Sequence, residues 1–390
     1  MKRATPQTVR QLNRQLVLKL IIDKGPLSRA ELSRATLLTK GTVSQVVSEL
    51  LDANAVIEVG AGSGEHVPGR KPILLRYNKQ AGVLVGIDMG GTNVQCGVAD
   101  LEGALMAVRS WPSEPNNNGF KRDRNAVLER TMAEIDITLA GLGLNREAVR
   151  GLAVASPGAV DPVTGEVSGL SPNLPDWHNF NLKEAFRSCF VGAAVTIEND
   201  VNAALIGEAR YGAGRGKENL ALLVISTGIG GAVMVGGQLY RGTRGASGEV
   251  GFLMFGEDTL EGDWTGRGCF ETLASGRALA VQAQKELGHQ DWDAEALFSA
   301  AGAGDPEAQA LVRRFADRIA LAVVNIAAVL DPEMIILGGG VSLSAEMFLG
   351  RVREMVRKHA PVEPDVVPAG LGAEAGMHGT IALAREAIWK

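Results

Sequence analysis

The sequence DMGGTN at residues 88–93 directly follows the apolar run VLVGI at residues 83–87. Another apolar run begins at once, at residues 94–98, so the pattern predicts a strand, a tight turn and a second strand. Glycines let the backbone of such a turn approach a phosphate, Thr92 offers a hydroxyl, and Asp88 could hold a magnesium ion. The stretch therefore predicts a phosphate-binding hairpin.

The same pattern recurs later in the chain. Apolar residues 221–225 lead into STGIGG at residues 226–231, and apolar residues 232–235 follow. A third glycine turn, GGG at residues 338–340, ends another apolar run and could form an adenine-side loop. One such turn could be no more than a tight hairpin. Three at matching places predict a duplicated α/β fold whose two lobes grip phosphates between them.

Length and composition are those of a globular protein with several domains. A chain of 390 residues predicts two or three domains, and 46% hydrophobic with 21% charged residues is ordinary. No apolar run reaches about 18 residues, so no membrane span is expected. The basic and then apolar start is interrupted by charges and predicts an amphipathic helix rather than a signal peptide. Three scattered cysteines, Cys96, Cys189 and Cys269, predict a cytoplasmic protein without a disulfide framework.

Charge is distributed unevenly along the chain. Residues 1–78 hold 12 Lys and Arg against 6 Asp and Glu, a net +6, and the remainder holds 39−12=27 against 44−6=38, a net −11. A basic head could favour a polyanion that the acidic body would repel. Ordinary charge scatter is the alternative explanation.

The basic head has the pattern of a helix-turn-helix. Val9, Leu12, Leu16 and Leu20 recur at helical spacing before Gly25-Pro26 stops the helix. Ser28 and Glu31 form a capping-box pattern for a short helix that carries Leu32 and Ala35 inward. Thr39 can cap a second helix, at residues 40–54, whose core face is Val43, Val46, Val47, Leu50 and Leu51.

The second helix of the head begins with short polar and amide side chains, which base reading in the major groove requires. A two-stranded wing follows, with a glycine-rich tip and a basic pair that could reach a phosphate or the minor groove. A small helical interaction domain with a hairpin is the alternative. The expected DNA contacts are Lys40, Thr42, Ser44, Gln45, Ser48, Arg70 and Lys71.

Taken together, these motifs resemble the ROK family of repressors, open reading frames and sugar kinases. The resemblance covers nearly the whole chain and includes the wing motif Gly-Arg-Lys-Pro at residues 69–72, DMGGT at residues 88–92, ASPG at residues 155–158 and ENDVNAA at residues 198–204. It implies an N-terminal winged helix-turn-helix and a two-lobed body of the actin-like ATPase and hexokinase type. We expect the head to span residues 1–78, the first lobe 79–200 and the second lobe, for sugar binding and dimerisation, 201–390, with a C-terminal helix that could return to the first lobe.

The resemblance also implies the residues of a sugar and nucleotide site. Asp200 would be the general base if the body acts as a kinase, and Asn199 would hold neighbouring hydroxyls. A polar strand end with a helix cap is the alternative for residues 198–200. The sugar-binding set would be Asn173, Asn199, Asp200, Glu249 and Glu271. The nucleotide-binding set would be Asp88, Gly90, Gly91, Thr92, Thr227, Gly228, Gly230 and Gly339.

The chain departs from the family where zinc is bound. The family has a zinc-binding His that also touches the sugar, where this chain has Phe252, and a run of three cysteines where it has only Cys269. Tetrahedral zinc needs four ligands, so we expect no zinc site and a loop held around Phe252, Phe255 and Trp264 instead. Asn93 also replaces a lysine of the family's kinases.

These features favour a sugar-responsive DNA-binding regulator of carbohydrate genes, with operator DNA and a sugar as partners, as a homodimer or a dimer of dimers. It would need no cofactor, although ATP and magnesium could still bind. An ATP-dependent, glucokinase-like hexose kinase with a DNA-binding head is the alternative. A catalytically inactive scaffold is a third, which the sugar-side residues argue against.

Overall fold

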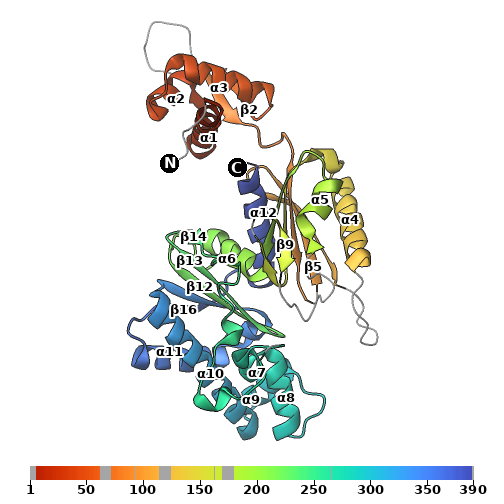
Figure 1. The fold of residues 1–390 in the computed structure, drawn as a ribbon, viewed down its shortest axis with the longest axis vertical. Coiled ribbons are helices and arrows are strands. Elements are labelled where there is room, and N and C mark those ends of the chain that lie inside the picture. The colour runs from red at the N-terminus through yellow and green to blue at the C-terminus, as the bar shows by residue number, and fades with distance from the viewer. Residues whose placement is uncertain are drawn as a thin grey trace.

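The computed structural model describes residues 6–61, 72–91, 93–113, 124–161, 163–168, 180–264 and 266–388. A head, a first lobe and a second lobe follow one another along the longest axis of the molecule (Figure 1). Among the described residues, no helix has the length and apolarity that a membrane crossing requires.

The head is a winged helix-turn-helix. Its helices are α1 (Pro6–Lys24), α2 (Arg29–Thr36) and α3 (Lys40–Asp52), and its antiparallel sheet has the order β1 (Leu27–Ser28), β3 (Ile73–Tyr77), β2 (Val56–Ala61). Ser28 and Glu31 form the expected capping box, and the Thr39 side chain accepts from the Thr42 N–H to begin α3. The helices therefore start where the sequence predicted.

Within the head, the expectation that Ala35 lies inward was wrong, and α1 does not bury the apolar residues whose spacing indicated the helix. Val9, Leu12 and Leu16 are exposed, and α1 instead buries Val17, Leu18 and Ile21. Ala35 on α2 is also exposed, although Leu32 is buried. In α3 the four residues Val43, Val46, Val47 and Leu50 are buried as expected.

The first lobe is built on a five-stranded sheet of order β11-β7-β4-β5-β6. Its strands are β4 (Val83–Met89), β5 (Asn93–Asp100), β6 (Leu105–Pro112), β7 (Val149–Ser156) and β11 (Ala194–Asn199). β4, β5 and β6 are antiparallel neighbours, whereas β7 and β11 run parallel to β4. The lobe also contains α4 (Arg124–Gly141), η1 (Arg146–Ala148), α5 (Leu182–Cys189) and a small sheet of β8 (Ala159–Val160), β9 (Glu166–Ser168) and β10 (Phe180–Asn181).

The second lobe repeats this topology with the sheet order β14-β13-β12-β15-β16. Its strands are β12 (Leu220–Ile225), β13 (Ile229–Val235), β14 (Gln238–Leu239), β15 (Met334–Gly338) and β16 (Asp365–Pro368). β12 and β13 form an antiparallel hairpin as β4 and β5 do, and β15 and β16 run parallel to β12 as β7 and β11 do to β4. The duplicated α/β fold expected from the glycine-rich hairpins is therefore confirmed.

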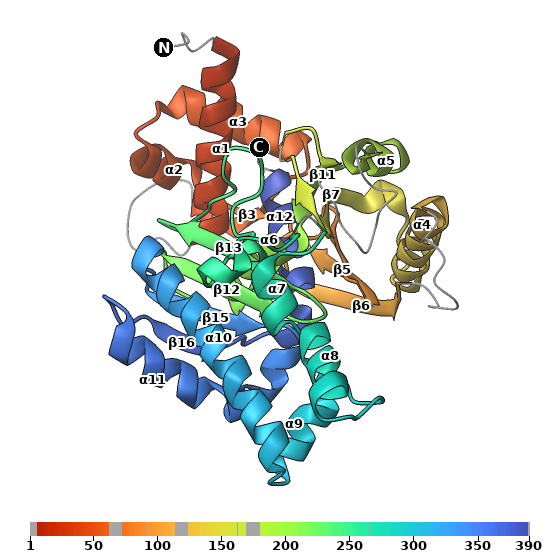
Figure 2. The same cartoon turned by 60° about the horizontal axis from the view of Figure 1, so that its bottom comes forward.

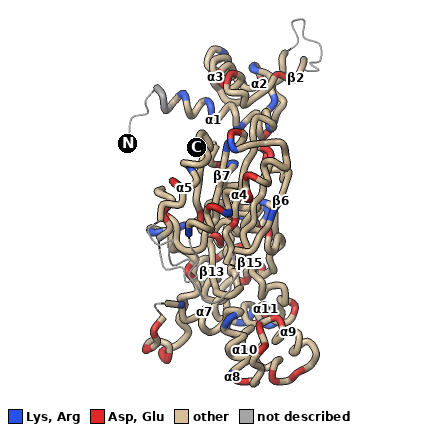
Figure 3. The backbone as a smooth tube through the Cα atoms, turned by 90° about the vertical axis from the view of Figure 1, so that its right-hand side faces the viewer, with Lys and Arg blue, Asp and Glu red and all other residues tan. Residues whose placement is uncertain are grey.

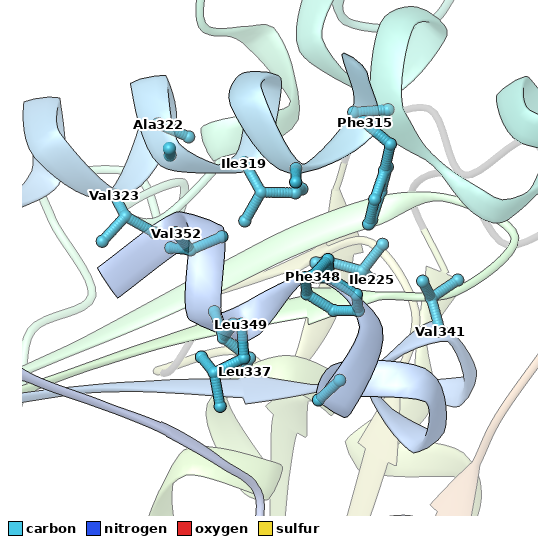
Figure 4. Close-up of a cluster of buried hydrophobic side chains, with 14 of the residues drawn as sticks. Ile225, Phe315, Ile319, Ala322, Val323, Leu337, Val341, Phe348, Leu349 and Val352 are labelled. Carbon is cyan, nitrogen blue, oxygen red and sulfur yellow. The ribbon is translucent and has the colours of Figure 1, made fainter. Parts of the chain in front are cut away.

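Helices cover the second sheet and form the largest apolar core. They are α7 (Cys269–Ala274), α8 (Gly276–Glu286), α9 (Ala294–Gly302), α10 (Pro306–Leu330) and α11 (Leu349–His359), with the short turns η3 (Val250–Phe252), η4 (Glu257–Thr259), η5 (Gly340–Met347) and η6 (Gly372–Glu374). Phe315 and Ile319 of α10 face Phe348 and Val352, and Leu337 of β15 lies beneath them (Figure 4). This packing fixes the strand ends that carry the glycine turns.

Two helices connect the lobes. α6 (Asp200–Tyr211) packs against β12 and β13, and α12 (Ala375–Ala387) packs against β4 and β7 of the first sheet. The two helices lie side by side between the sheets (Figure 2). A Cβ at Gly207 would overlap the carbonyl oxygen of Ala375, and one at Gly379 would overlap that of Ala203. The main chains of α6 and α12 therefore pack directly against each other where the helices cross. The C-terminal helix α12 lies on the sheet of the first lobe, as the sequence allowed.

Candidate functional site

A polar cavity of about 430 Å³ lies between the two lobes. The first lobe contributes the glycine turn after β4 and the junction of β11 with α6, and the second lobe contributes the turn after β12, the loop before η3 and the start of α7. These segments are far apart in the sequence, so only the duplicated fold brings them together. The expected site residues that line the cavity are Gly91, Asn199, Asp200, Thr227, Gly228, Gly230, Glu249 and Glu271.

Asn199 ends β11 and caps α6. Its Oδ1 accepts from the Asn202 N–H at 3.0 Å, while its Nδ2 donates to the Gly158 carbonyl at 3.1 Å and to Asp200 Oδ1 at 3.0 Å. The helix-cap alternative for this stretch is thus present in the structure, on a residue that also lines the cavity. Capping holds the Asn199 amide and the Asp200 carboxylate at fixed positions against the cavity.

Three carboxyl groups gather at the cavity wall. Burial raises the pKa of Asp200, and burial followed by the neighbouring Asp200 and Glu271 raises the pKa of Glu249. Glu271 Oε2 accepts from the Ile229 N–H at 3.0 Å and so ties α7 to the second glycine turn. Carboxylates in a poorly hydrated cavity are strong acceptors for the hydroxyl groups of a sugar ring.

A second cavity of about 220 Å³ adjoins the first and shares Gly91 and Asp200 with it. Asp88, Gly90 and Gly339 line this smaller cavity, whereas Thr227, Gly228 and Gly230 line the larger one. Burial, reinforced by Asp200, raises the pKa of Asp88 to about 7. Asp88 and Asp200 thus place two neighbouring carboxylates at one cavity wall, and carboxylate oxygens are the ligands that a divalent cation such as Mg²⁺ prefers.

Four of the expected site residues fall outside the part of the chain that the structure describes. Thr92, in the first glycine turn, and Asn173, in the sugar set, fall on residues that the structure does not describe. The same holds for Arg70 and Lys71 of the wing. Their roles stay predictions.

Sequence reasoning missed an ion pair that joins the two lobes. The Glu198 side chain, on β11, is 5% exposed and accepts from Arg241 Nε at 2.8 Å, and Arg241 follows β14 in the second lobe. Glu198 Oε1 also accepts from Asn202 Nδ2 at 3.0 Å. Arg241 begins the loop that carries Ser247 and Glu249 into the cavity, so the pair anchors a cavity loop to the first lobe. The partners are 43 positions apart in the sequence, so no local pattern could indicate the pair.

Glu208 was also missed. Its side chain is fully buried in α6 and accepts backbone N–H bonds from Ala213 at 2.8 Å, Gly370 at 3.0 Å and Leu371 at 2.8 Å. Its carboxylate therefore fixes the loop after β16 beside the smaller cavity, which it also lines. A helical pattern alone gives no reason to bury this glutamate.

The residues in place of the family's zinc site do not suit a metal ion. Cys269 is buried at the start of α7, and Phe252 is 51% exposed. Among the described residues, no three His, Cys, Asp or Glu side chains cluster closely enough to hold a metal. Trp264 Nε1 instead donates to the Thr259 carbonyl at 2.7 Å, and Phe255 packs edge-on against Phe270 at 5.1 Å between ring centroids. The expectation that Phe252 helps to hold this loop stays a prediction, and its half-exposed side chain lines the larger cavity.

In the head, the recognition helix α3 presents a polar surface. Lys40, Ser44, Gln45 and Ser48 are exposed, and Thr42 is half-buried with its hydroxyl 2.9 Å from that of Thr39. Figure 3 shows Lys and Arg at intervals along α1. Arg10 Nε donates to Glu49 at 2.9 Å, which fastens α1 to α3. The arrangement leaves the N-terminal half of α3 open to a partner.

Fold and site together define a protein with a winged helix-turn-helix head and a two-lobed body of the actin-like, hexokinase type. The ROK family matches residues 84–387, and the chain belongs to this family. The xylose repressor of Bacillus subtilis (strain 168) is 30% identical over 375 residues, which cover 94% of this chain and 93% of the repressor.

Two solved structures share this fold. A ROK family transcriptional regulator, described as a homologue of the E. coli MLC protein, matches with a TM-score of 0.80 at 23% identity and covers 98% of this chain and 97% of its own. A ROK glucokinase from Streptomyces griseus, in complex with glucose and AMPPNP, matches with a TM-score of 0.65 at 30% identity and covers 78% of this chain and 100% of its own. The family thus includes regulators and sugar kinases, and this chain has the extent of the regulators.

Proposed function

We propose that the protein is a sugar-responsive DNA-binding repressor of carbohydrate-metabolism genes, acting in the cytoplasm. One observation carries the proposal: a head with an exposed, polar recognition helix is joined to a body whose interlobe cavity is lined by Asn199, Asp200, Glu249 and Glu271. A polar helix start suits the major groove, and a carboxylate-lined cavity suits a polyol. A repressor that is released by a sugar needs both parts on one chain.

Sugar binding would act through the loops that both lobes contribute. Ring hydroxyls donate to Asp200 and Glu249, which sit on different lobes, so a bound sugar favours the arrangement that brings both within reach. Arg241 and Glu198 couple the same loop to β11. A change in lobe angle is passed to the head through the first sheet, which the head directly precedes in the chain.

Two heads would act together on DNA. We propose a homodimer, or a dimer of dimers, because helix-turn-helix proteins bind two half-sites at a spacing set by their own two-fold symmetry. Lobe closure that alters this spacing would lower operator affinity without touching α3. Arg70 and Lys71 would add phosphate contacts from the wing.

The names of relatives suggest which sugar is the effector, and a DNA-release assay tests the suggestion. Because relatives at about 30% identity over most of the chain are named xylose repressors, xylose is the first candidate effector and glucose the second. A duplex selected by the wild-type chain from a random-sequence pool, called the selected duplex below, serves as the DNA probe. We expect xylose or glucose to release it. Equal affinity for the selected duplex with and without every monosaccharide tested would contradict the proposal.

A sugar kinase with a DNA-binding head is the second candidate, and the smaller cavity favours it. Asp88 and Asp200 would hold the Mg²⁺ of a bound Mg–ATP, with Gly90, Gly91 and Gly339 beside the phosphates, and Mg²⁺ would supply charge for phosphoryl transfer. Asp200, with its raised pKa, would accept the proton of a sugar hydroxyl. We propose that turnover is weak or absent, since the zinc that would fix a sugar loop has no suitable ligands and displacement by about 1 Å can cost a hundredfold.

A coupled assay of ATP consumption with the effector sugar separates the two candidates. We expect little sugar-dependent turnover. A rate on the order of 10 per second, typical of working enzymes, would make the protein a bifunctional kinase and regulator.

A further inference from the structure

Leu37 occupies an unusual conformation at the turn of the helix-turn-helix. It ends α2 with φ 60° and ψ 14°, in the left-handed region. The non-glycine residues with positive φ in the described part of the chain are Leu37, Asn54 and Asp331. Asn and Asp tolerate this region because their short side chains bond locally, whereas leucine is strained there, and helices that end this way usually do so with glycine.

The same side chain is almost entirely exposed. Leu37 is 91% accessible to solvent, while the next residue, Leu38, is half-buried and packs against the core of the head. Leu37 therefore combines a strained backbone conformation with an apolar side chain that lies almost entirely in water.

Neighbouring side chains impose this conformation. The Ser33 hydroxyl donates to the Leu38 carbonyl at 2.7 Å, and the Thr36 hydroxyl donates to the Leu32 carbonyl at 2.6 Å and accepts from the Leu38 N–H at 3.4 Å. The turn is thus held firmly on both sides of Leu37. A strained residue that its surroundings hold in place is a candidate for a functional contact.

The position of Leu37 indicates the partner. It lies two residues before Thr39, the N-cap of α3, and so at the end of the recognition helix that enters the major groove. Lys40, Ser44 and Gln45 follow on the exposed surface of α3. On the major-groove edges of the base pairs, the one apolar group is the C5 methyl of thymine.

We propose that Leu37 reads a thymine methyl group in the operator, as an apolar contact beside the polar contacts of α3. The inference rests on the proposed DNA binding and goes further, because it names a specificity-determining residue and the base it selects. The turn holds the leucine outward before DNA arrives, so no rearrangement is needed on binding.

The test uses the full-length chain and the selected duplex. Leu37→Asn keeps the left-handed turn without strain and removes the apolar group, whereas Leu37→Met keeps an apolar side chain. We expect Leu37→Asn to weaken binding about three- to tenfold, as loss of one methyl contact would, and Leu37→Met to bind within about twofold of wild type, because its apolar contact is retained. Leu343→Asn is the matched control, because Leu343 is 84% exposed in the second lobe.

Replacing the thymines of the selected duplex one at a time with uracil, which lacks only that methyl, locates the contact. We expect one position per half-site to weaken wild-type binding and to leave Leu37→Asn unaffected. The melting temperature of Leu37→Asn should equal or exceed that of wild type, since strain is relieved, which excludes misfolding as the cause of lost affinity.

Three outcomes overturn the inference. In the first, Leu37→Asn binds the selected duplex as tightly as wild type. In the second, Leu37→Asn loses the same affinity for every duplex and no single uracil substitution weakens wild-type binding, which would mean that Leu37 contacts the DNA backbone and not a base. In both cases DNA binding itself stands. If the wild-type chain selects no duplex from the pool, the proposed function fails and the thymine contact fails with it.

Discussion

At the residue scale, the chemistry of the cavity comes from carboxylates that the fold brings close together. Asp88 and Asp200 come from the ends of strands in one sheet, and Glu249 and Glu271 come from the other lobe. Burial raises the pKa of Asp88, Asp200 and Glu249, because it disfavours the charged form of each carboxyl group. Hydrogen-bond donors of a ligand, or a cation, would stabilise the charged forms of these groups.

Asp200→Ala should lose the sugar response and keep DNA binding. Removal of one buried acceptor leaves its sugar hydroxyl unpaired, which costs about 1–3 kcal/mol, so at least about fivefold more sugar should be needed to release the selected duplex. Fluorescence anisotropy of labelled duplex measures this. Asp291→Ala, an exposed aspartate in the second lobe, is the control. A sugar response at the normal concentration would place the pocket elsewhere.

Asp88→Asn should stabilise the protein in a pH-dependent way. The folded-state pKa of Asp88 is about 7 against an ordinary value of 3.8, so its contribution to stability is complete below about pH 4 and is lost as pH rises towards 7. At pH 8 the variant should be more stable by about 2–4 kcal/mol, with little difference at pH 4. Denaturant unfolding at both pH values measures the difference. A constant difference between pH 4 and pH 8 would contradict the assignment.

At the element scale, the helix-turn-helix and the loop in place of the zinc site show what local sequence can specify. Caps, turns and glycine hairpins were predictable because their signals lie within a few residues, as with Ser28 and Glu31. The buried face of α1 was not, because apolar residues occur on two of its faces and only packing selects Val17 and Ile21 over Leu12. Likewise, Arg241 reaches Glu198 through tertiary structure alone.

Gln45→Ala should weaken binding to the selected duplex. An amide side chain that bonds a base edge contributes about 1–3 kcal/mol of discrimination, so affinity should fall by roughly five- to 150-fold while binding to random duplex changes little. Gln238→Ala, on an exposed strand of the second lobe, is the control. If affinity for selected and random duplexes falls equally, Gln45 contacts no base.

The purified protein should contain far less than one zinc per chain. The loop around Trp264 is closed by the Thr259 carbonyl and by packing of Phe255 on Phe270, and one thiolate cannot hold tetrahedral zinc tightly. Elemental analysis gives the metal content, and a chelator should leave the melting temperature unchanged. Stoichiometric zinc that a chelator removes with loss of stability would contradict this.

At the scale of the whole molecule, communication between cavity and head depends on how the lobes are joined. The two sheets share one topology, α6 and α12 cross between them, and the Glu198–Arg241 pair joins a cavity loop to β11. The Glu198–Arg241 pair connects the lobes through charged side chains, and the crossing of α6 and α12 connects them through main-chain contacts. In the proposed mechanism, sugar binding would be linked to head spacing through these contacts.

Arg241→Ala should uncouple the sugar response while DNA binding persists. The cavity loop loses its anchor, so more sugar is needed to stabilise the closed arrangement, with a coupling of about 1–3 kcal/mol between positions 198 and 241 in a double-mutant cycle with Glu198→Gln. Sugar titrations of the protein–duplex complex give each corner of the cycle. Arg314→Ala, which breaks the exposed pair with Glu286, is the control. Additive effects of the two substitutions would show that the pair carries no coupling.

The crossing of α6 and α12 at Gly207 and Gly379 is made by main-chain atoms. Such a crossing makes no demand on the side chains of the cavity loops, so those loops can diverge without changing how the lobes are joined. We therefore expect the residues that select the effector sugar to be able to change without altering the contacts that join the lobes. Grafting residues 242–271 from a relative, which leaves Arg241 and its pair with Glu198 in place, should exchange the inducing sugar and retain the operator.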